Sequence, residues 1–237
     1  SKCFPRGRSA HDRRRAAGLG HSAAGLGALP ARVALGRRSR AWIELFSDLR
    51  RQHLLFGTVV VLFLLWLVRR DFASGLSMHF IGMTAVTLLL DWPLAILAGL
   101  LAQLGLIAVG RPDLASLGIN GILLVLIPVA ITEACANLVE RFQPNNLFVY
   151  IFCSGFFPAA LTAIACVFAS LGLLLLDGRY EMPPWLEDFA GYLWLLAFPE
   201  AFINGMVIAG LVVFCPDWLE TFNRSRYLSA PWKDEDR

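Results

Sequence analysis

Four ionisable side chains interrupt the long apolar stretches of this sequence: His79, Asp91, Glu133 and Glu200. An ionisable group inside a membrane-spanning helix is costly, so each of these groups is a candidate for function. Asp91 stands where a helix is expected to end, and we interpret it as an interfacial charge. His79 and the two glutamates are therefore the residues from which a site would be built.

His79 is the strongest candidate metal ligand, because neutral imidazole is the commonest metal ligand among protein side chains. Met78 precedes it, and Met83 lies four residues on, on the same face of a helix. Imidazole suits nickel, copper, zinc and cobalt-like ions, whereas thioethers favour soft metals. The alternative is a histidine that is hydrogen-bonded between helices or wetted at the interface.

Each of the two glutamates has an asparagine one helical turn later, Asn137 after Glu133 and Asn204 after Glu200. Such a pair could bind a cation or hold a file of water, or could equally form hydrogen bonds between helices. We favour Glu200 and Asn204 as cation ligands, because Pro199 beside them frees a backbone carbonyl.

The composition places these residues in a membrane protein. The 237 residues are 57% hydrophobic and only 16% charged, whereas about a quarter of the residues in soluble domains are charged. A helix needs about 20 residues to cross the hydrocarbon. We therefore predict an all-α fold, a polytopic membrane bundle of about six transmembrane helices. The expected spans are 52–68, 74–90, 93–110, 117–139, a long region 147–176 that is tilted, kinked near Pro158 or partly interfacial, and 190–214.

Charge and composition divide the chain into three parts. Residues 1–40 are rich in Arg, Gly, Ala and Ser without apolar periodicity, and we expect them to be disordered or an artefact of gene calling. The transmembrane permease domain is predicted over 41–222, with a polar tail over 223–237. Residues 1–51 carry a balance of +9 and residues 52–237 one of −6. The basic part has few interleaved aromatics and no recognisable nucleic-acid fold, so we expect no nucleic-acid partner.

The third span carries a stripe of small residues, Ala98, Ala102 and Gly105. Small residues let helices approach closely. Two interpretations stay open, ordinary packing within the chain and a docking face for another membrane subunit.

Several catalytic signatures are missing from the sequence. No G-x-x-x-x-G-K-[ST] segment occurs, and the only lysines are Lys2 and Lys233, so any ATP-driven transport needs a separate ATPase. Neither G-x-S-x-G nor H-E-x-x-H is present. We therefore expect no enzyme and no cofactor of its own; the alternative to a transporter subunit is a non-transporting membrane scaffold or assembly protein.

Two segments resemble the CbiM/NikM-type permeases of energy-coupling-factor transporters, and most resemble their divergent proteobacterial branch. In "GLSMHFIGMTAVTLLLDWPLAILAGLLAQ", His79 falls at the histidine of the family's His-Pro-Thr-Gly type segment and Gly82 at its glycine. In "LAFPEAFINGMVIAGLVVFCPDWL", the run from Phe198 to Ala201 matches the family's Phe-Pro-Glu-Ala. The resemblance covers roughly residues 72–222.

The resemblance implies a substrate-binding subunit that captures a transition metal ion, Co²⁺ or Ni²⁺, in a bacterial inner membrane. It implies separate ATPase subunits and a scaffold transmembrane subunit as partners. The family's metal site combines an N-terminal Met-His with the histidine matched by His79. This sequence differs from that pattern, because Phe80-Ile81 replaces Pro-Thr and no N-terminal Met-His is present.

Overall fold

The structure, a computed structural model, describes residues 42, 45–68, 70–71, 77–111, 116–142, 146–176, 189–223 and 227. The chain forms two compact units, Ser1–Asp48 and Leu49–Arg237. The predicted segment 1–40 and nearly all of the predicted tail 223–237 lie outside the described residues. All the helices and strands named in this section belong to the second unit, Leu49–Arg237.

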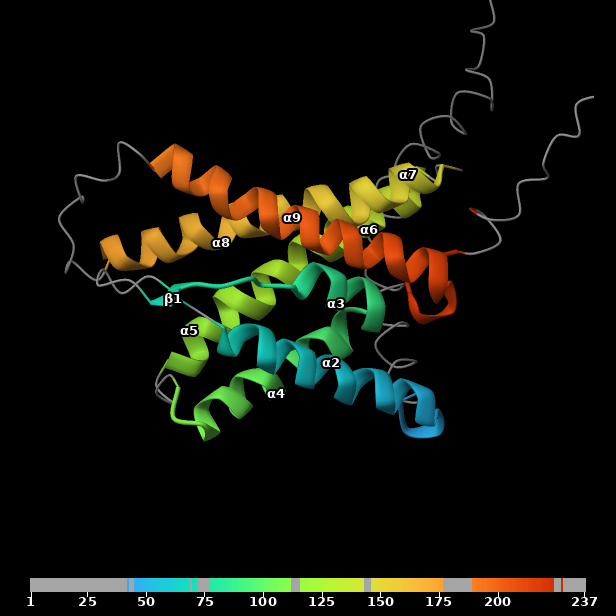
Figure 1. Cartoon of the computed structure of the whole chain (residues 1–237), viewed down its shortest axis with the longest axis horizontal. Coiled ribbons are helices and arrows are strands. Elements are labelled where there is room, and N and C mark those ends of the chain that lie inside the picture. Colours follow the sequence, from blue (N-terminus) through green and yellow to red (C-terminus); the bar gives the residue numbers. More distant parts are fainter. Residues whose placement is uncertain are drawn as a thin grey trace, which may run out of the picture. The chain divides into compact units, whose positions relative to one another are not determined.

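This unit is a bundle of helices, which confirms the predicted all-α fold (Figure 1). Its elements in chain order are α2 (Leu49–Leu67), α3 (Met83–Leu90), α4 (Trp92–Ala108), α5 (Leu117–Gly121), η2 (Ile122–Leu126), α6 (Ile127–Phe142), α7 (Leu147–Tyr150), η3 (Ile151–Phe156), α8 (Phe157–Leu176), α9 (Phe189–Phe214) and η5 (Pro216–Trp218). Within the described residues, four helices are long and apolar enough to cross a membrane: 49–67, 117–142, 147–173 and 193–214. Helix α4, with 17 residues, is slightly shorter.

The second predicted span, 74–90, is wrong as a continuous helix. Residues 77–78 form a two-residue strand, β2 (Ser77–Met78), which pairs antiparallel with β1 (Arg70–Asp71). Residues 79–82 are non-helical, and α3 begins only at Met83. Gly82 has φ 68°, a left-handed conformation that ends regular α-helix. Hydropathy alone does not reveal such a break, since irregular backbone is tolerated in a membrane protein where it is buried in protein.

The short helix α3 lies at the centre of the bundle. It contacts α2, α4, α6, α8 and α9. Its side chains Met83, Thr87 and Leu88 are fully buried, and the Thr84 hydroxyl accepts a hydrogen bond from Thr132 in α6 at 3.1 Å. Whatever fixes the N-terminus of α3 therefore fixes the middle of the bundle.

A π-helical turn precedes each of two helical prolines, η2 before Pro128 and η3 before Pro158. A proline lacks the N–H that would continue the helical ladder, and its ring clashes with the preceding turn. The wider turn absorbs this clash. The π-helical turn η3 therefore lies directly before Pro158, the position at which a kink was one of the predicted alternatives.

One backbone carbonyl in the π turn η2 lacks a hydrogen-bond donor within its own helix, and a side chain of a neighbouring helix donates to it. Within η2 the hydrogen bonds join residues five apart, as in Ile127 N–H to Ile122 O. On that pattern, Leu123 O would need the N–H of Pro128, which does not exist. The Cys166 thiol of α8 donates to Leu123 O at 2.9 Å instead. This hydrogen bond links α8 to η2, within the long helix 117–142.

The stripe of small residues on α4 packs within the chain. Ala98 and Ala102 are fully buried. A Cβ at Gly105 would lie 3.1 Å from the ring of Phe63 in α2, tighter than an ordinary contact, so the glycine eases the close approach of the two helices. Of the two interpretations of the stripe, packing within the chain is the one that the structure shows.

Candidate functional site

The non-helical segment 79–82 is held on both of its backbone edges. On one edge, the Trp66 indole Nε1 donates to Ile81 O at 2.9 Å. On the other, the N–H groups of Ile81 and Gly82 donate to the two carboxyl oxygens of Glu200 at 2.9 and 2.7 Å. Buried backbone groups without partners are costly, so these bonds are what allows an irregular segment here.

Asn204, one turn after Glu200, completes a cap for α3 that is supplied by another helix. Its Oδ1 accepts from Ala85 N at 2.9 Å. Its Nδ2 donates to Glu200 O at 2.8 Å and to Glu200 Oε1 at 2.9 Å. Because the first N–H groups of a helix lack partners within the helix, a carboxylate and an amide at this end satisfy them. Both side chains are buried, at 3% and 1% exposed.

The hydrogen bonds to Glu200 fix the backbone of the segment 79–82, whose first residue is His79. Its Nδ1 lies 3.0 Å from Phe80 O, and its ring lies 6.3 Å from the Trp66 ring, centroid to centroid. A carbonyl oxygen can only accept, so the contact with Phe80 requires hydrogen on Nδ1. In the neutral ring the lone pair then resides on Nε2, which is the form in which histidine binds a metal.

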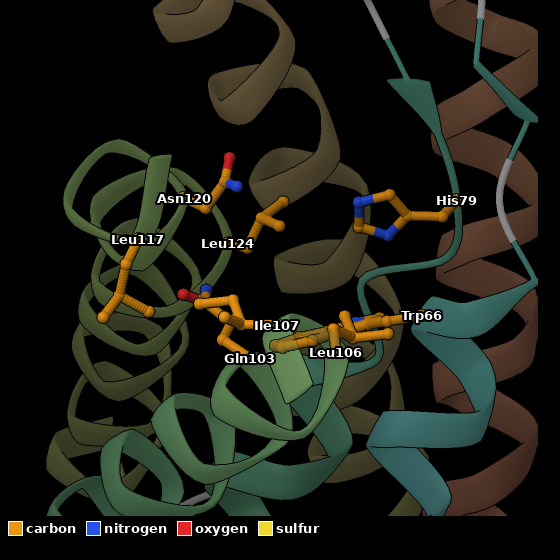
Figure 2. Close-up of a pocket in the computed structure, with 8 residues that line it drawn as sticks. All are labelled: Trp66, His79, Gln103, Leu106, Ile107, Leu117, Asn120 and Leu124. Carbon is orange, nitrogen blue, oxygen red and sulfur yellow. The ribbon is translucent and has the colours of Figure 1, made fainter. Parts of the chain in front are cut away.

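The His79 ring borders a small pocket of about 20 Å³ (Figure 2), room for roughly one water-sized group. In Figure 2 the imidazole comes from one side of the pocket, and the amides of Gln103 and Asn120 come from the other. The pocket is lined by aromatic, aliphatic and polar side chains of α2, the segment before α3, α4, α5 and η2: Trp66, His79, Gln103, Leu106, Ile107, Leu117, Asn120 and Leu124.

The other predicted metal ligands lie outside this lining. Met83 is buried, and its methyl group would be 3.4 Å from a Cβ at Gly99, so it packs against α4. Glu200 and Asn204 reach the same loop as His79, but through backbone N–H groups. Met78 belongs to β2, and its side chain lies outside the described residues.

Glu133 and Asn137 repeat the local bond of the capping pair. Asn137 Nδ2 donates to Glu133 Oε1 at 3.1 Å, four residues away. The repeated E-A-x-x-N pattern therefore predicts the local bond, whereas the cap on the N-terminus of α3 comes from Glu200 and Asn204.

Gln103 and Asn120 were not predicted from the sequence, because the candidates were ionisable residues and the methionines and asparagines close to them in the chain. A signal existed, because Gln103 is an amide in the otherwise apolar segment Trp92–Ala108. Within the described residues, no group of three or more His, Cys, Asp or Glu side chains is arranged to hold a metal ion. Any cation at His79 would therefore draw on other donors, such as amides, backbone groups or water.

Comparison with known proteins gives one family. The model described as CbiM, the cobalt uptake substrate-specific transmembrane region, matches residues 23–218. Neither the curated proteins nor the solved structures contain a significant match. The matched range includes every element from α2 to α9.

Proposed function

This chain belongs to the CbiM family of cobalt uptake substrate-specific transmembrane regions, and on that premise we propose that it captures Co²⁺ or Ni²⁺ as the substrate-binding membrane subunit of an energy-coupling-factor transporter. It is a membrane protein of a transporter family, and its cargo is a metal ion. The bacterial inner membrane is the proposed location.

The observation that carries this proposal is the placement of His79. The ring borders a pocket of ionic size, with its lone pair directed to Nε2 by the Phe80 carbonyl. An imidazole nitrogen suits cobalt, nickel and similar divalent ions better than it suits magnesium or calcium. We propose His79 as the direct ligand.

Glu200 and Asn204 support the site by positioning, in this proposal. Both hold the backbone that follows His79, and Glu200 uses both of its oxygens to do so. A ligand held on a fixed backbone loses less conformational entropy when the ion binds. Met78 and Met83 complete the set of residues predicted from the sequence; Met83, in α3, packs against Gly99 of α4 and supports the bundle from outside the pocket.

The energy for transport comes from other subunits in this proposal. The sequence has no phosphate-binding loop of the Walker type, so separate ATPase subunits and a scaffold transmembrane subunit would supply it. The chain itself captures the ion and passes it on.

Titration calorimetry of the full-length protein in detergent tests the capture step. Stoichiometric binding of Co²⁺ or Ni²⁺, with Mg²⁺ binding far more weakly, supports the proposal. If titration with neither Co²⁺ nor Ni²⁺ gives a heat of binding, the proposed capture function is contradicted.

A further inference from the structure

We propose that Gln103 is a second contact for the captured ion, through its amide oxygen, on the wall of the pocket opposite His79. This inference rests on the function proposed above. Gln103 lies in α4 and is 5% exposed. Neither its Oε1 nor its Nε2 has a hydrogen-bond partner among the described residues.

An unsatisfied buried amide is unusual, because it loses its hydrogen bonds to water and gains none in return. The rest of α4 consists of apolar and small residues, so a leucine or methionine would suit the packing of this helix better. The polar group is therefore explained by something that binds it when the pocket is occupied.

The pocket indicates what that occupant is. Gln103 and His79 line the same space of about 20 Å³, which admits roughly one water or one ion. Figure 2 shows the imidazole on one side and the Gln103 amide on the other. A space of this size is too small for an organic chelate of a metal, so we infer that the substrate class is a free metal ion.

The atoms that would bind the ion narrow the class of metal further. An imidazole nitrogen favours transition metals, whereas amide oxygens are hard donors. A mixed set of this kind suits a borderline divalent ion such as Co²⁺ or Ni²⁺, and it discriminates against soft Cu⁺, which seeks sulfur, and against Mg²⁺, which keeps its water. Among the described residues that line the pocket, none is a carboxylate. Neutral donors hold a dication less tightly than charged ones do, which suits a cargo that must be released.

The variant Gln103→Met tests the contact, because it keeps the length of the side chain and removes the amide. Calorimetry with Co²⁺ on the full-length protein should show affinity at least tenfold weaker, and the visible absorption bands of bound Co²⁺ should shift. The melting temperature of the metal-free variant should stay the same or rise, because an unsatisfied amide has been removed.

Ser154→Ala is the matched control. The Ser154 hydroxyl is also fully buried and without a partner among the described residues, but it does not line the pocket. Its removal should leave Co²⁺ affinity within a factor of two. A tenfold loss in this control as well would overturn the assignment of the effect to the pocket.

Gln103→Glu is a second variant, in case the methionine variant folds poorly. A carboxylate oxygen at the same position should bind Co²⁺ more tightly than the wild type, because it adds ligand charge. Unchanged affinity and unchanged absorption bands in both Gln103 variants would overturn this inference alone and leave the proposed capture function standing. A wild-type protein that binds neither Co²⁺ nor Ni²⁺ would overturn both.

Discussion

Glu200 and Gly82 are 118 positions apart in the chain, and the carboxyl Oε1 of the first accepts a hydrogen bond from the N–H of the second at 2.7 Å. The same carboxyl group accepts from Ile81 through its other oxygen. Helix α9 thereby holds the start of α3 and the segment that carries His79. The position of His79 in the proposed site therefore depends on this hydrogen bond.

The variant Glu200→Gln should destabilise the protein by about 1.5–3 kcal/mol, the typical contribution of a hydrogen bond to a charged group. Glutamine keeps one oxygen but turns an NH₂ group toward a backbone N–H, so two donors face each other. Thermal unfolding in detergent, followed by circular dichroism, measures the change. Glu133→Gln is the matched control, because that glutamate has the same local bond to an asparagine, whereas the N–H groups at the start of α3 are bonded to Glu200; its loss of stability should be clearly smaller than that of Glu200→Gln. Equal losses in the two variants would contradict the capping role.

Substitution of Gly82 by alanine should cost more stability than the same change at Gly110. Both glycines have positive φ, 68° and 80°, which costs a non-glycine residue about 1–2 kcal/mol. At Gly82 the added Cβ would also lie 2.9 Å from Leu65 Cδ2, whereas nothing lies within 4 Å at Gly110. Unfolding curves of the two variants give the comparison, and Co²⁺ calorimetry should show weakened binding only in Gly82→Ala. Similar stability and similar affinity in both variants would show that the shape of this loop is unimportant.

The thiol of Cys166 should be replaceable by a hydroxyl but not by a methyl group. Cys166→Ser keeps a donor for the Leu123 carbonyl that the π turn releases, so its stability should remain close to that of the wild type. Cys166→Ala leaves this buried carbonyl without a partner and should cost about 1–3 kcal/mol. The same unfolding assay compares them. If alanine is tolerated as well as serine, the thiol does not support the π turn.

The sequence predicted the helices better than the breaks between and within them. Five of the six expected spans agree with helices to within a few residues, because hydropathy and helix-ending turns are local properties. The second predicted span, 74–90, does not agree with a continuous helix, because the non-helical segment 79–82 is stabilised by Trp66 and Glu200, which are remote in sequence. The wider turn near Pro158 was foreseeable, because a proline inside a helix disturbs its own preceding turn.

The site was predictable in part for a similar reason. The rarity of ionisable groups in apolar stretches singled out His79 and Glu200, and the structure brings both to the same segment of backbone. What each side chain does there depends on tertiary contacts, which is why the capping of α3 by Glu200 and Asn204 was not foreseen. Gln103 escaped notice because it carries no charge, although a buried amide is also costly.

Co²⁺ calorimetry of the full-length protein in detergent, comparing the wild type with His79→Ala, tests whether His79 is a ligand of the captured ion. His53→Ala is the control, since that histidine is exposed on α2 and does not line the pocket. We predict that the wild type and His53→Ala bind Co²⁺ with the same stoichiometry and affinity, and that His79→Ala loses binding. Unchanged binding in a folded His79→Ala variant would contradict this prediction.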